Sequence, residues 1–170
     1  MELYFGGKKR FGKSTIRQIG GSRKGSVDYR FKGADGLCVL DGDDYVLYRA
    51  YRERLSERWT VRNAKEEVAG TLSRESAFSD TRFEYDAGGR GTYLIEEDIG
   101  GYRIEGTGQA AFVDLKRRRL QSDEYWLQTD DTQNGGVSEY EWVAVIHGIS
   151  ALRERSPWTT ALTAIGGIFS

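Results

Sequence analysis

Cysteine, proline and histidine are almost absent from this sequence of 170 residues; each occurs once, as Cys38, Pro157 and His147. A single cysteine excludes an internal disulfide, and no Cys/His set with zinc-ligand spacing exists. We therefore expect no metal or cofactor, and a reducing, cytoplasmic location. The sequence also lacks a continuous run of about 20 apolar residues, so we expect no transmembrane segment.

An excess of charge of either sign is missing as well. The chain has 25 Lys and Arg against 26 Asp and Glu, a net charge of -1. This balance argues against nucleic acid as a partner. Aromatic residues (12%) and glycine (22 residues) are abundant. Because aromatic side chains favour strands and hairpin turns need glycine, the composition predicts a mainly β protein.

A weak internal repeat of 20 to 23 residues runs through the middle of the chain. Its copies begin at Gly36, Arg58, Thr81, Gly101 and Glu124. Each copy reads as a short strand, a polar turn and a returning strand, which is the pattern of a β-hairpin. With an earlier copy near Ser14 and a first strand near Leu3, this gives about twelve strands. A sheet of that size tends to close, because closure removes its edges.

The pattern changes near residue 138. Ser138, followed three residues later by Glu141, forms a capping box, and Val137 and Trp142 stand where a hydrophobic staple would place them. Residues 142–152 carry no charge. A helix that is apolar on every side is normally buried, and a barrel of a dozen strands is too wide for its own side chains to fill.

We therefore expect an antiparallel barrel of about twelve strands, built from repeated hairpins, that encloses one apolar C-terminal helix. The helix is expected over about 138–155. Residues 1–157 would form a single domain, and residues 158–170 an apolar tail. A propeller is a weaker alternative, because each blade takes about 40 residues.

The hairpins from Leu37 to Leu127, the basic segment 116–120 and the segment 141–146 resemble the tubby C-terminal-like superfamily. The likeness is to its LURP-one-related branch and, more distantly, to the phospholipid scramblases. This resemblance implies a twelve-stranded barrel threaded by a hydrophobic helix. Tubby-like domains are associated with phosphoinositides and scramblases with membrane lipids. The resemblance thus implies a non-enzymatic domain that binds anionic lipid at a membrane surface.

Two basic clusters are the candidate binding residues. They are Lys8, Lys9, Arg10 and Lys13, and Lys116, Arg117, Arg118 and Arg119. If they converge, they form a basic rim for an anionic headgroup or another anionic partner. The alternative is a solvated strand edge protected by its charge.

Other features have weaker functional interpretations. Gly7–Ser14 matches the phosphate-loop pattern G-x-x-x-x-G-K-[ST], but no long helix is predicted after it, so a nucleotide-binding protein is disfavoured. His147 is expected to be a satisfied core residue and Cys38 an inert thiol. Asp41–Asp44 is expected to form a hairpin turn. The uncharged tail leaves a protein-interaction or oligomerisation module as an alternative function.

Overall fold

The computed structural model describes residues 2–6, 12–29, 36–53, 56–76, 81–106, 124–129 and 136–153, and the backbone of 110–116. The strands are β1 (Glu2–Gly6), β2 (Lys13–Gln18), β3 (Arg23–Asp28), β4 (Gly36–Asp41), β5 (Val46–Arg52), β6 (Trp59–Asn63), β7 (Val68–Arg74), β8 (Arg82–Asp86), β9 (Thr92–Asp98), β10 (Gly101–Gly106), β11 (Ala110–Lys116) and β12 (Glu124–Thr129). The helices are the short 3-10 helix η1 (Gly88–Arg90) and α1 (Glu139–Arg153).

The strands form a closed antiparallel barrel in which neighbours in the chain are neighbours in the sheet. The ring closes at β1, where Leu3 lies opposite Gln18 of β2 and Leu127 of β12. The predicted repeat is confirmed, because β4, β10 and β12 start where three of its copies were expected and each full copy is one hairpin.

Alternation of side chains along the strands gives the barrel an apolar interior. In β8, Phe83 and Tyr85 are buried whereas Arg82, Glu84 and Asp86 are exposed. This period of two is what a strand with one face on a core requires. The buried residues of the strands and of α1 belong to one continuous core cluster.

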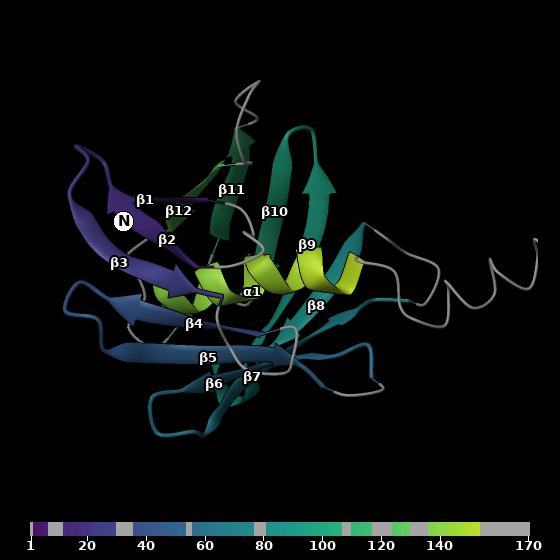
Figure 1. Ribbon diagram of the computed structural model, residues 1–170. Helices are drawn as coiled ribbons and strands as arrows, with labels where there is room; N and C mark the ends of the chain where they lie inside the picture. The colour runs from purple at the N-terminus through teal and green to yellow at the C-terminus, as the bar shows by residue number, and fades with distance from the viewer. Residues whose placement is uncertain are drawn as a thin grey trace, which may run out of the picture.

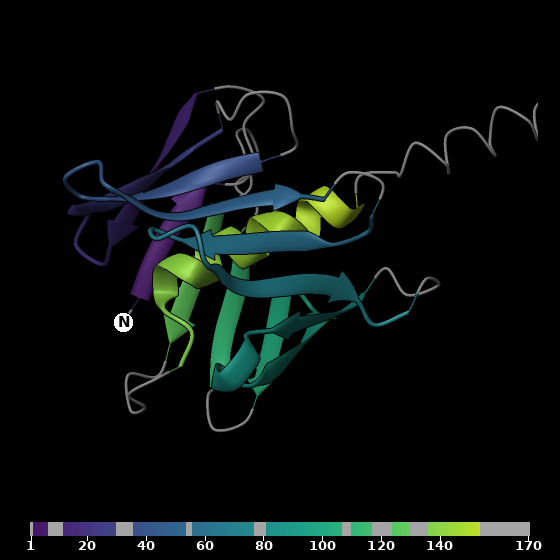
Figure 2. The same ribbon diagram turned by 90° about the horizontal axis from the view of Figure 1, so that it is seen from below.

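Helix α1 occupies the inside of this barrel. Figure 1 shows it crossing the ring of strands, and Figure 2 shows it between the blue strands β4–β7 and the green strands β9–β12. Eleven of its residues are buried, on all sides of the helix. The predicted central helix is therefore confirmed. Among the described residues, no helix combines the length and the apolar character needed to cross a membrane.

The two ends of α1 distinguish the two ends of the barrel. At the N-cap end, the Tyr48 hydroxyl lies 2.9 Å from the Ser138 Oγ, just before the helix starts. At the exit end, Arg74 donates a hydrogen bond to the Leu152 carbonyl and the Arg153 guanidinium donates to the Tyr102 hydroxyl at 3.0 Å. These hydrogen bonds connect both ends of the helix to the barrel wall.

Candidate functional site

The structure describes two of the eight predicted basic residues. Lys13 is the first residue of β2 and Lys116 is the last residue of β11. The ammonium of Lys13 lies 3.8 Å from the Asp44 carboxylate, which also binds Arg23 at 2.7 Å. Lys13 is thus already engaged by an acidic residue. The other six, Lys8, Lys9, Arg10, Arg117, Arg118 and Arg119, lie outside the described residues.

The strand ends that precede the two basic segments lie on either side of the start of β12. Gly6, which precedes residues 7–11, is the register partner of Glu124, and Glu124 is the partner of Lys116, which precedes residues 117–123. Partners in an antiparallel pair have Cα atoms about 5 Å apart. Both basic segments are therefore attached to adjacent strands at the exit end of the barrel.

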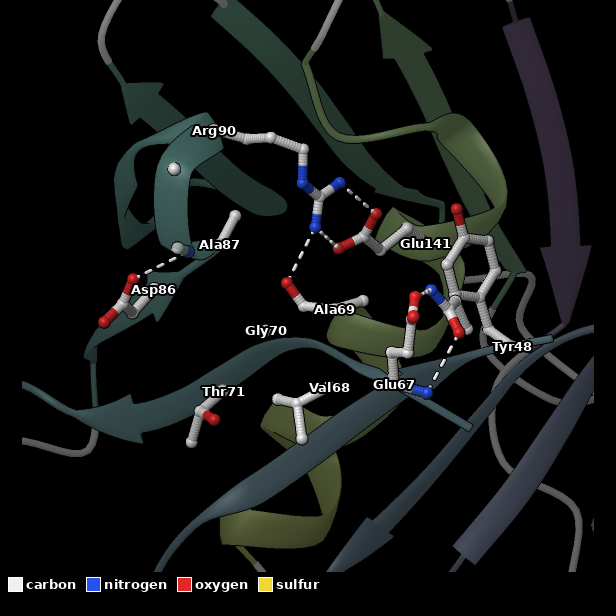
Figure 3. Close-up of a pocket in the computed structure, with 13 residues that line it drawn as sticks. Tyr48, Glu67, Val68, Ala69, Gly70, Thr71, Asp86, Ala87, Arg90 and Glu141 are labelled. Atoms are coloured by element: carbon white, nitrogen blue, oxygen red, sulfur yellow. Dashed lines mark hydrogen bonds and ion pairs between the residues drawn. The ribbon is translucent and has the colours of Figure 1, made fainter. Parts of the chain in front are cut away.

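A hollow of about 470 Å³ opens in the barrel wall at the N-cap end (Figure 3). The pairing of β7 with β8 ends at Thr71 and Asp86, while β7 continues back to Val68. After Asp86 the chain turns through η1 instead of extending the strand. The hollow lies in the gap that this turn leaves in the wall.

An ion pair between Arg90 of η1 and Glu141 of α1 spans the hollow (Figure 3). The guanidinium binds both carboxylate oxygens, with Nη1–Oε2 at 2.6 Å and Nη2–Oε1 at 2.8 Å, and its Nη2 also donates to the Ala69 carbonyl at 2.7 Å. The Tyr85 hydroxyl donates to Glu141 Oε1 at 2.5 Å. Glu141 is fully buried, whereas about a third of the Arg90 side chain (31%) is exposed.

The charged groups of this network are matched to one another, so we assign the network a structural role and not a ligand-binding one. The hydrogen bonds from Arg90 to Glu141 raise the pKa of Arg90. Burial, reinforced by the neighbouring Glu141 carboxylate, raises the pKa of Tyr85. The Glu141 carboxylate is therefore matched to one guanidinium and one phenol. Because the Arg90 charge is already neutralised, the hollow offers no free cation for an anionic ligand.

The sequence indicated Glu141 as part of a capping box, in which its carboxylate would bind the backbone N–H of Ser138. That partner is wrong. The N-cap itself is as expected, since the Glu141 N–H donates to Ser138 Oγ at 3.2 Å and Val137 and Trp142 are both buried. The Glu141 carboxylate, however, binds Arg90 and Tyr85. The available signal was an acidic residue directly before a charge-free helix, which needs a buried partner from another segment.

His147 is a satisfied core residue, as expected. Its Nδ1 lies 2.8 Å from the Val143 carbonyl, which can only accept, so Nδ1 carries the proton. In the neutral ring Nε2 then accepts from the Tyr29 hydroxyl at 2.7 Å. Phe5 and Tyr125 also contact the imidazole ring. The histidine thus packs as part of the core.

The remaining motifs are explained by local structure. Lys13–Gln18 form strand β2, so the Gly7–Ser14 match lacks the helix that a phosphate loop requires. Asp41 Oδ1 accepts from the N–H groups of Asp43 and Tyr45, which makes 41–45 a hairpin turn. Cys38 is half-buried, and burial raises the pKa of its thiol, which disfavours the reactive thiolate. The predicted tail 158–170 lies outside the described residues.

The buried tyrosines predict a loss of stability at alkaline pH. Burial raises the pKa of Tyr29 and of Tyr85 above the ordinary value of 10. Their stabilising effect is complete below about pH 10 and falls as the pH rises, because the unfolded chain then releases protons that the folded chain keeps. We expect each to steepen the decline by about 1.4 kcal/mol per pH unit above pH 10. Urea unfolding at several pH values measures this slope.

The control for this prediction is a solvent-exposed tyrosine of the same protein. Tyr45 is 71% exposed, so Tyr45→Phe should leave the slope unchanged, whereas Tyr85→Phe should reduce it by one proton. Equal slopes in both variants would contradict the prediction.

No protein-family profile and no curated protein matches the sequence. Among solved structures, the X-ray structure of the Arabidopsis thaliana protein AT5G01750 is similar, with a TM-score of 0.58 and 13% sequence identity. The similarity covers 91% of this chain and 92% of that chain. At this level of identity the likeness concerns architecture, and function must be argued from the site. This chain therefore shares its fold with the Arabidopsis protein.

Proposed function

We propose that this chain is a non-enzymatic binding domain of the tubby-like, LURP-one-related kind, which binds an anionic phospholipid headgroup or another anionic partner at the exit end of its barrel. It would act in the cytoplasm, at a membrane surface. The observation that carries the proposal is the register in which Glu124, at the start of β12, pairs with both Gly6 and Lys116. Residues 7–11 follow β1 and residues 117–123 precede β12, and these two strands are adjacent.

Charge supports this choice of end. Residues 7–11 contain three basic and no acidic residues, and residues 117–123 contain three arginines and one aspartate. A basic residue near an anionic membrane surface contributes about 1 kcal/mol. The hollow at the N-cap end is a poorer anion site, because its arginine is neutralised by Glu141.

Sedimentation with vesicles tests the proposal. We expect the protein to pellet with vesicles that contain phosphatidylserine and to remain in solution with phosphatidylcholine alone. Changing Lys8, Lys9 and Arg10 to glutamine should weaken binding by about 3 kcal/mol, roughly 150-fold. The matched control changes Arg17, Lys24 and Lys65, which belong to the opposite end of the barrel. The proposal is wrong if the wild-type protein pellets with neither kind of vesicle. It is also wrong if both triple variants lose binding equally.

A further inference from the structure

Ile99 is a fully exposed apolar residue at the exit end of the barrel. It stands in the turn that joins β9 and β10, at the top of the view in Figure 1. Its relative exposure is 103%, the highest of the large apolar side chains that the structure describes. The others with high exposure, Ile19, Tyr45 and Val68, have values of 55 to 71% and belong to the N-cap end.

The conformation of this turn does not need an isoleucine. Asp98 Oδ1 accepts from the Ile99 N–H at 2.7 Å, and Gly100 supplies the left-handed backbone, with a φ of 82°. Aspartate and glycine are residues that turns favour, whereas β-branched side chains favour strands. Because the Ile99 side chain is entirely exposed, it adds no packing to the core. A reason for this residue has to come from the surface around it.

The carboxylates beside Ile99 are neutralised. Each of the three acidic residues that directly precede Ile99 in the chain forms an ion pair with an arginine, at 2.8 to 3.2 Å. The pairs are Glu96–Arg82, Glu97–Arg153 and Asp98–Arg103. The turn therefore carries no net negative charge that would repel an anionic surface.

The same turn is next to one of the two basic segments. Gly101, the first residue after the turn, is the register partner of Asp114 in β11. Strand β11 continues to Lys116, and the basic segment 117–123 follows it. Ile99 and this segment are thus attached to adjacent strands, β10 and β11, at the same end of the barrel.

The sequence places large apolar residues unequally at the two ends. The six strand connections at the exit end each contain one; these residues are Phe11, Phe31, Leu55, Phe78, Ile99 and Leu120. Four of the six directly follow an arginine in the sequence. At the N-cap end, the connections 64–67, 87–91 and 107–109 contain no large apolar residue. Of the six residues, Ile99 is the one whose side chain the structure describes.

We infer that Ile99 inserts into the interfacial layer of an anionic membrane when the exit end of the barrel binds it. This rests on the proposed function and names the residue that enters the membrane. Binding at a membrane interface gains from buried apolar area and from attraction to anionic lipids, and the exit end supplies both. A single side chain on a turn suits a fluid bilayer, whereas a stable protein partner needs a contiguous surface.

Ile99→Ser is the test, with Ile19→Ser as the matched control. Ile19 is 58% exposed in the β2–β3 turn at the N-cap end, so its variant makes the same chemical change at the opposite end. Binding is measured by sedimentation with phosphatidylcholine vesicles that contain phosphatidylserine. We expect Ile99→Ser to weaken binding roughly tenfold and Ile19→Ser to weaken it less than about twofold.

Ile99→Trp reports insertion directly. Tryptophan is favoured at membrane interfaces, so this variant should bind vesicles as well as wild type does. When the phosphatidylcholine of the vesicles is brominated, we expect stronger quenching of fluorescence for Ile99→Trp than for wild type or for Ile19→Trp. Ile99→Ser should unfold at the wild-type urea concentration, because a fully exposed side chain contributes no packing.

The outcomes separate this inference from the proposed function. The inference is overturned, and the proposed function stands, if wild type binds and Ile99→Ser binds equally well, or if both serine variants lose binding equally. Quenching of Ile99→Trp no stronger than that of Ile19→Trp, or a lower urea midpoint for Ile99→Ser, also overturns it. If Ile99→Ser loses binding but the variant of Lys8, Lys9 and Arg10 does not, insertion stands and recognition through the basic rim is wrong. If wild type binds no vesicle, both are wrong.

Discussion

Glu141→Gln is expected to destabilise the protein by about 3 kcal/mol, the low end of the cost of breaking a buried ion pair. Glutamine has the same shape, but its amide nitrogen cannot accept from Arg90. One of the two donors that bind Glu141 at 2.6 and 2.8 Å would then face another donor. Arg90 is 31% exposed, so water can compensate part of the loss, which is why we expect the low end.

The measurement is the free energy of unfolding in urea at neutral pH. Glu139→Gln is the matched control, because Glu139 stands in the same first turn of α1 and is not part of the Arg90 network. It should change stability by less than about 0.5 kcal/mol. Equal effects of the two variants would show that the buried ion pair does not form in solution.

The double variant Arg90→Met, Glu141→Leu sharpens this prediction. Apolar side chains of similar volume often replace a buried ion pair at little cost, whereas removing one partner leaves a buried charge. We expect the double variant to be more stable than Glu141→Gln alone. The hydroxyl of Tyr85 would lose its acceptor in this variant, so the Tyr85→Phe background is the appropriate reference.

The architecture could be predicted from the sequence because its signals are local and repeated. Hairpins need only alternation around a turn, and the copies that begin at Gly36 and Gly101 coincide with the starts of β4 and β10. The burial of α1 followed from the absence of charge over residues 142–152. Both arguments depend on residues close to one another in the chain.

The contacts of polar side chains could not be predicted, because their partners are distant in the chain. Glu141 and Arg90 are separated by 51 positions, and the sequence alone gives no reason to pair them.

The second large effect is expected for Gly148→Ala, in the middle of α1. In an isolated or exposed helix this change is favourable by about 1 kcal/mol, because alanine is the better helix former. Here a Cβ on residue 148 would lie 2.4 to 2.6 Å from three atoms of the Trp59 indole. The indole is buried and hydrogen-bonded to the Ala144 carbonyl, so it cannot move away freely. We expect a net loss of about 2 to 3 kcal/mol.

The sign of this change tests whether α1 lies inside the barrel. If α1 packs against β6 as the structure shows, Gly148→Ala destabilises, and Gly148→Ala combined with Trp59→Leu recovers part of the loss by removing the ring that clashes. Each change is measured by urea unfolding, together with Trp59→Leu alone to complete the double-mutant cycle. Gly89→Ala is the control, because nothing lies within 4 Å of its added Cβ. A stabilising Gly148→Ala would mean that this face of the helix is not packed against Trp59, and the enclosed helix on which the fold depends would have to be abandoned.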